Sequence, residues 1–94
     1  METLIEHEYG CLKADFTYGN PVLHLQVTNW SHTILKDIVY PLWNKVLSDL
    51  KDRGYEAVYA YIPSHEKKII KFHKIMGMHI VAEENGYTLT GRGL

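Results

Sequence analysis

The stretches LKDRGYEAVYAYIP, residues 50–63, and KKIIKFHKIMGM, residues 67–78, decide the fold of this chain. In the first stretch, Gly54 ends a helix, and the run EAVYAYIP that follows is typical of a strand. In the second, apolar residues recur at helical spacing with lysines on the opposite side, which predicts an amphipathic helix capped by Ser64 and ended by Gly77. A helix, a strand and a second helix in this order indicate an α/β fold with a parallel crossover.

A longer helix is predicted over residues 34–50, because the apolar side chains there fall on one helical face. Ser31 or Thr33 is expected to cap its start. Pro41 lies inside the pattern and has no N–H to donate to the Asp37 carbonyl. We therefore expect a kink or a late helix start at this proline.

Two strands are predicted before this helix. Residues 12–18 alternate between apolar and polar side chains, and residues 21–28 form a second strand after a Gly-Asn-Pro turn. Residues 3–9 are a weaker candidate for a further strand.

A hairpin is predicted near the C-terminus. Residues 78–84 and 87–91 flank Asn85-Gly86, the strongest short hairpin signal in the chain. The predicted order is therefore β-β-α-β-α-β-β, with a mixed β-sheet and two main helices in a single domain over residues 1–94.

Composition places the chain among ordinary globular proteins. Of 94 residues, 46% are hydrophobic and 22% are charged, and the net charge of -1 gives no overall attraction to nucleic acid or membrane. Cys11 is the only cysteine, which excludes an intramolecular disulfide and a multi-cysteine metal site. The histidines lack the spacing of metal ligands, so we expect no metal.

The cellular setting follows from what the sequence lacks. It has neither an apolar run long enough to span a membrane nor a secretion signal, so we expect a cytoplasmic protein without a membrane partner. A chain this short gains burial by pairing with a copy of itself, so a homodimer is a further expectation.

The two stretches quoted above resemble the C-terminal core of the GNAT N-acetyltransferase superfamily. In that family the last core helix typically carries an aliphatic pair, a Phe-Tyr-like pair and Gly-Phe. Here these are Ile69-Ile70, Phe72-His73 and Gly77-Met78. The chain is also similar to small GNAT-like proteins of tailed phages, some of which have lost the family's cofactor motif. The resemblance implies a truncated GNAT-like fold.

The resemblance also implies a position for acetyl-CoA, at a turn of the form Gln/Arg-x-x-Gly-x-Gly/Ala before the long helix. The implied cofactor-binding residues are Ser31, His32, Thr33 and Lys36. The span from Asn20 to Arg53 contains no glycine, although bare backbone is what lets the pyrophosphate approach closely. Glu66 stands where the family has an asparagine, and its charge repels a phosphate-rich cofactor. We therefore expect no cofactor, and acetyl-CoA only if the chain is catalytic.

Three residues are candidates for catalysis. His73 takes the place of the family's tyrosine that protonates the departing thiolate, and a histidine can act as an acid near neutral pH. His24 and Gln26 lie on the strand where members of the family place a general base. The alternatives are that His73 packs on an amphipathic helix and that His24 and Gln26 are solvated strand residues.

A second group of residues is a candidate surface for a protein partner. It consists of Trp30, Tyr40 and Trp43 near the start of the long helix and of Lys67, Lys71 and Lys74 on the second helix. The alternatives are core packing for the aromatic residues and a solvated helix face for the lysines. No aromatic residues interleave with the lysines, so nucleic-acid binding is not expected.

Two functions follow from these alternatives. One is a GNAT-fold protein of phage type, an accessory or inhibitor protein that acts by binding a protein partner. The other is a minimal acetyl-CoA-dependent N-acetyltransferase.

Overall fold

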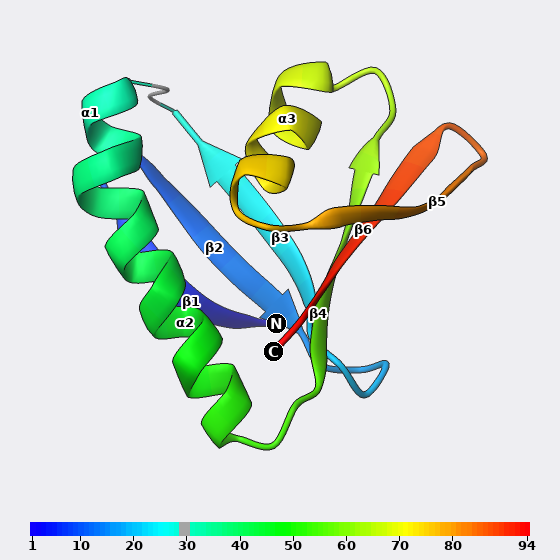
Figure 1. Cartoon of the computed structure of the whole chain (residues 1–94), viewed down its shortest axis with the longest axis horizontal. Coiled ribbons are helices and arrows are strands. Elements are labelled where there is room, and N and C mark those ends of the chain that lie inside the picture. Colours follow the sequence, from blue (N-terminus) through cyan, green and yellow to red (C-terminus); the bar gives the residue numbers. More distant parts are fainter. Residues whose placement is uncertain (29–30) are drawn as a thin grey trace.

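The computed structural model describes residues 1–28 and 31–94, except for the side chains at positions 32 and 35. Within these residues, six strands form one mixed sheet in the order β1-β2-β3-β4-β6-β5 (Figure 1). The strands are β1 (Glu2–His7), β2 (Gly10–Asp15), β3 (Val22–Val27), β4 (Ala57–Pro63), β5 (His79–Glu84) and β6 (Tyr87–Gly93). Strands β3 and β4 are parallel, and the other neighbouring pairs are antiparallel. The predicted α/β class with a mixed sheet and two main helices is confirmed, and the weaker candidate strand is β1.

The long helical run changes its winding along its length. It consists of α1 (His32–Ile34), the π-helical segment η1 (Leu35–Val39) and α2 (Tyr40–Asp52). Pro41 lies in the first turn of α2, where a missing N–H is tolerated. The π-helical segment directly before it shifts the hydrogen-bond pattern by one residue. The sequence predicts a kink or a late helix start at Pro41; the helical run already begins at His32, and what changes next to the proline is the winding, from π-helix to α-helix.

Helix α3 (Lys67–Ile75) begins later than the sequence indicates, and the prediction of Ser64 as its N-cap is wrong. Glu66 precedes the first helical residue and makes no side-chain cap bond. The Ser64 hydroxyl instead shares a 2.9 Å hydrogen bond with the Thr88 hydroxyl, and its N–H donates to the Gly86 carbonyl at 2.8 Å. These bonds fix the turn after β4 against the hairpin of β5 and β6.

The hairpin itself forms as predicted. Asn85 has a φ of 53° and Gly86 a φ of 79°, and two successive positive φ values are the signature of a type I′ turn. Asn-Gly is the residue pair that adopts this turn at least cost, so the prediction from this dipeptide is confirmed.

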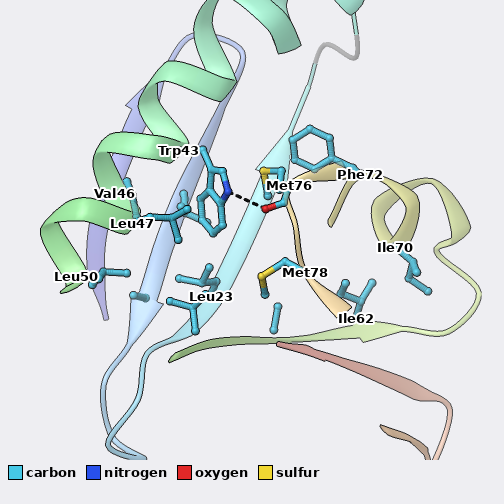
Figure 2. Close-up of a cluster of buried hydrophobic side chains, with 14 residues drawn as sticks. Leu23, Trp43, Val46, Leu47, Leu50, Ile62, Ile70, Phe72, Met76 and Met78 are labelled. Atoms are coloured by element: carbon cyan, nitrogen blue, oxygen red, sulfur yellow. Dashed lines mark hydrogen bonds between the residues drawn. The ribbon is translucent and has the colours of Figure 1, made fainter. Parts of the chain in front are cut away.

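Both main helices cover the same face of the sheet, and the core lies beneath them (Figure 2). The buried core residues include Trp43, Val46, Leu47 and Leu50 of α2, Ile70 and Phe72 of α3, Met76 and Met78 after it, and Val58, Ala60 and Ile62 of β4. Trp43 connects the helices, because its indole N–H donates to the Met76 carbonyl oxygen at 3.0 Å. Among the described residues, no helix is left to cover the opposite face.

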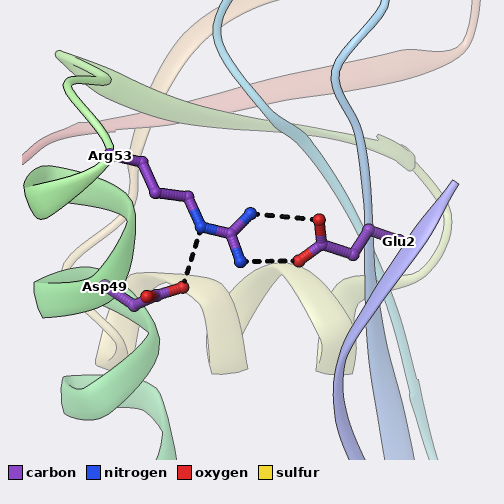
Figure 3. Close-up of polar contacts among 3 residues, drawn as sticks. All are labelled: Glu2, Asp49 and Arg53. Carbon is purple, nitrogen blue, oxygen red and sulfur yellow. Dashed lines mark hydrogen bonds and ion pairs between the residues drawn. The ribbon is translucent and has the colours of Figure 1, made fainter.

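A three-residue ion cluster ties β1 to the end of α2 (Figure 3). The Arg53 guanidinium contacts both carboxylate oxygens of Glu2, at 3.0 and 2.8 Å, and its Nε lies 3.1 Å from an oxygen of Asp49. The hydrogen bonds from Arg53 lower the pKa of Glu2. All three side chains are partly exposed to solvent, so the cluster positions β1 more than it stabilises the fold.

Candidate functional site

A groove opens between β3 and β4. The only register pair that joins these parallel strands in the described residues is Val22 with Tyr59, supported by a 3.0 Å bond from the Tyr59 N–H to the Pro21 carbonyl. Beyond this point the strands diverge toward their C-terminal ends (Figure 1). The resulting β3–β4 groove has a volume of about 220 Å³ and is lined by Leu23–Gln26, Ala60–Pro63, Ile69 and His73.

The groove continues toward the start of α3. A second hollow of about 510 Å³ shares Leu25, Gln26 and Ile69 with the first. Glu66 and Lys68 also line this hollow, so it carries one charge of each sign.

His73 is buried at the wall of the β3–β4 groove. Only 2% of the residue is exposed, and its Nδ1 has no hydrogen-bond partner among the described residues. Loss of solvation lowers its pKa from 6.5 to about 4. The imidazole is therefore neutral at pH 7, with one N–H to donate and one lone pair to accept. This pKa opposes the role of an acid near neutral pH and fits a hydrogen-bonding group or a base.

His24 and Gln26 reach the same groove from the other side of the sheet. Both are exposed and lie two residues apart on β3, so their side chains share a face. The Gln26 side-chain oxygen also lies 3.7 Å from the Cys11 sulfur. The structure thus brings all three predicted catalytic residues to one groove.

The face of the sheet opposite the helices is rich in tyrosine. Tyr59 and Tyr61 alternate with the buried residues of β4, and Tyr87 lies on the same face because residues 59, 61 and 63 pair with 91, 89 and 87 of β6. Tyr18, from the turn after β2, joins Tyr59 and Tyr61 around a hollow of about 620 Å³. We call Tyr18, Tyr59, Tyr61 and Tyr87 the tyrosine face.

The tyrosine face is open to solvent and partly apolar. Exposed fractions are 77% for Tyr18, 58% for Tyr61 and 49% for Tyr87. Gly91 leaves room for the Tyr59 ring, because a Cβ at this position would lie 2.9 Å from the ring. Asp15 lines the hollow as a carboxylate, since hydrogen bonds from Thr17 lower its pKa.

Comparison with known proteins identifies the fold but no family. No family model and no curated protein matches the chain. The crystal structure of SsHAT, an acetyltransferase of the GNAT type, matches with a TM-score of 0.66 and 25% identity over 79% of this chain. The chain has a GNAT-like fold.

A second solved structure shares the fold of nearly the whole chain. A domain from Methanocaldococcus jannaschii DSM 2661 matches with a TM-score of 0.74 and 19% identity over 98% of this chain. The chain covers 36% of SsHAT and 63% of the archaeal structure, so it corresponds to part of each.

The predicted cofactor-binding residues lie apart from the groove of the GNAT-like fold. Ser31, directly before the long helical run, and Thr33 and Lys36, on its first turns, are exposed, and none of them lines the β3–β4 groove or the adjoining hollow. The His32 side chain lies outside the described residues. Glu66, in contrast, lines the hollow directly.

The predicted partner-binding residues of this GNAT-like chain have four different outcomes. Lys67, Lys71 and Lys74 are exposed on α3, as expected both for a partner surface and for a solvated helix face. The prediction that Trp43 contacts a partner is wrong, because only 3% of Trp43 is exposed and its indole is bonded within the core. Tyr40 is half-buried against the core, and Trp30 lies outside the described residues.

The tyrosine face was visible in the sequence only in part. The alternation in AVYAYI indicates that Tyr59 and Tyr61 share one side of a strand. Which side the helices cover depends on the crossover, and no local pattern encodes it.

The described residues include no cluster of potential metal ligands. Among their helices, none has the length and apolar character of a membrane span.

Proposed function

We propose that this chain is a GNAT-like binding protein that acts in the cytoplasm on a protein partner, as an accessory or inhibitor protein of phage type. The observation that supports this proposal is the uncovered sheet face with its four tyrosines. Tyrosine combines a large apolar ring with a hydroxyl group and loses little rotamer entropy on binding, which makes it a frequent anchor of protein interfaces. Such a face is uncommon on a surface that serves only solvation.

The β3–β4 groove supports binding of acetyl-CoA less well than the tyrosine face supports binding of a protein. The span that should grip the pyrophosphate has no glycine, and Glu66 lines the hollow through which the phosphates would pass. A carboxylate close to a pyrophosphate raises the free energy of the complex through charge repulsion. A buried His73 with a pKa of about 4 is also neutral at pH 7, so it is not the imidazolium acid that could protonate a thiolate.

Variants of the tyrosine face test the proposed interface. We expect Tyr61→Ser combined with Tyr18→Ser to weaken binding of the partner by about 30-fold or more, because a tyrosine at the centre of an interface contributes about 2 kcal/mol. Both side chains are largely exposed, so the fold should be retained. The measurement is quantitative capture from cell extract with wild-type and variant baits side by side, followed by titration of the captured protein.

The matched control is Lys71→Ser with Lys74→Ser, which changes two exposed residues of α3 and should leave capture unchanged. Loss of capture with the lysine variant and not with the tyrosine variant would move the interface to α3. Unchanged capture with both would remove the proposed role of the tyrosine face.

A second candidate function is acetyl transfer, favoured by the meeting of His24, Gln26 and His73 at one groove. Calorimetric titration with acetyl-CoA separates the two functions. We expect no binding heat at cofactor concentrations up to about 1 mM, where the binding free energy would be about -4 kcal/mol. Micromolar binding would favour the transferase, and His73→Ala should then lower turnover more than cofactor affinity.

A further inference from the structure

Strand β5 is an open edge of the sheet. It is the last strand in the order β1-β2-β3-β4-β6-β5, and all six of its residues are exposed. Ile80 and Val81 expose 43% and 58% of their surface, although both are apolar. The strand contains neither proline nor lysine, the residues that most often protect an edge from pairing with another chain. Its outer N–H and C=O groups are therefore available to a further strand.

A bulge in β5 sets which side chains point to which face. The register with β6 shifts between Ile80 and Ala82, so Val81 is the extra residue. Val81 lies on the tyrosine face, because its Cγ2 would be 3.2 Å from a Cβ at Gly91. Ala82 pairs with Leu89 and points to the same face. Two neighbouring residues of β5 thus point the same way.

The remaining residues of β5 alternate around this bulge. His79 pairs with Gly91 and Glu84 pairs with Tyr87, so both lie on the tyrosine face. Ile80 and Glu83 pair with Thr90 and Thr88, which places them on the helix face.

We propose that β5 pairs antiparallel with β5 of a second copy of this chain, about a two-fold axis between Val81 and Ala82. Directly opposed residues in an antiparallel pair must point to the same face. Because of the bulge, this condition holds along the full strand in only one register. In that register His79 lies opposite Glu84 of the copy, Ile80 opposite Glu83 and Val81 opposite Ala82.

On the tyrosine face, the register also places complementary groups opposite each other. The His79 imidazole of each chain lies opposite the Glu84 carboxylate of the other, so the dimer contains this pair twice. The two Val81 side chains flank the axis, each against an alanine, which buries apolar surface that the single chain exposes. A strand of six residues forms a small interface, so we expect a dissociation constant of roughly tens to hundreds of micromolar.

The other edge of the sheet, β1, fits a second copy less well. Its central residues Leu4 and Ile5 are half-buried and pack against the core. The carboxylate of Glu2 is already held by Arg53. Pairing through β1 would therefore gain less apolar burial and would compete with an existing ion pair.

Sedimentation analysis over protein concentrations from about 10 µM to 1 mM tests the proposal. The wild-type mass should rise from 10.9 kDa toward twice that value. Val81→Lys should keep the chain monomeric, because two ammonium groups would meet at the axis. Ile75→Lys is the matched control, since Ile75 is an exposed apolar residue of α3 and should not affect pairing. Tyr61→Ser should also leave the dimer intact.

The register is tested by exchanging charges. His79→Glu places carboxylate opposite carboxylate twice and should weaken the dimer about tenfold. The double variant His79→Glu with Glu84→Lys should regain the wild-type affinity. A wild type that stays monomeric throughout, a Val81→Lys variant that still dimerises, or a double variant without recovery would each overturn the proposal. Circular dichroism of each variant separates lost pairing from lost folding.

Discussion

Replacing Trp43 by alanine is expected to lower the free energy of unfolding by about 3–5 kcal/mol. The indole is 3% exposed and lies between α2 and the residues that follow α3, so its removal leaves a cavity at the centre of the core (Figure 2). For a domain of this size the loss corresponds to a fall in Tm of roughly 15–30 °C. Thermal and urea unfolding of the two proteins measure it.

Trp43→Phe separates the loss of volume from the loss of the hydrogen bond. The Met76 carbonyl also accepts a 2.8 Å bond from the Arg92 guanidinium, so it keeps a donor when the indole N–H is removed. We therefore expect Trp43→Phe to cost only about 1–2 kcal/mol. A phenylalanine variant as unstable as the alanine variant would show that the indole bond, and not packing, holds α2 to the end of α3.

The second large effect concerns pH. The pKa of His73 is about 4 in the folded chain, below its ordinary value of 6.5, because burial disfavours the charged imidazole. The unfolded chain thus takes up a proton from pH 6.5 downward, and the folded chain does not until pH 4. The resulting stabilisation is complete above the unfolded pKa and is lost as the pH falls toward the folded pKa, with a total of about 3 kcal/mol.

His73→Leu removes this dependence. The difference in unfolding free energy between wild type and His73→Leu should change by about 2 kcal/mol between pH 7.5 and pH 5, in favour of the variant at the lower pH. Urea unfolding at both pH values measures it. The carboxylates of Glu2 and Asp15 have ordinary pKa values of 4.5 and 3.8, lowered further in the fold, and add little in this range. Parallel curves for the two proteins would place the His73 side chain in contact with water.

The order of strands and helices could be predicted because short residue patterns encode it. Gly54 marks a helix end, Asn85-Gly86 marks a type I′ turn, and Pro41 marks the start of α2. The prediction of Ser64 as an N-cap is wrong because a contact with a distant residue, and not a short pattern, determines where its hydroxyl bonds. Its hydroxyl bonds to Thr88, a residue more than twenty positions away that no helix-capping pattern contains.

The same distinction applies to the site. The spacing in FHKIMG and the alternation in HLQ identified His73, His24 and Gln26 as candidates, and the fold brings them to one groove. Sequence patterns could not show that His73 is buried and neutral, because that depends on what packs over α3. They also could not show that Trp43 lies between two helices, since an aromatic residue early in a helix is equally consistent with an exposed position.

The single pairing of β3 with β4 has a mechanical consequence. Seven register pairs join β4 to β6, whereas Val22 and Tyr59 form the single register pair across β3 and β4 in the described residues. The sheet is therefore hydrogen-bonded continuously within β1-β2-β3 and within β4-β6-β5, but only weakly between these two halves. His24 and Tyr61 line the groove that this weak junction leaves open.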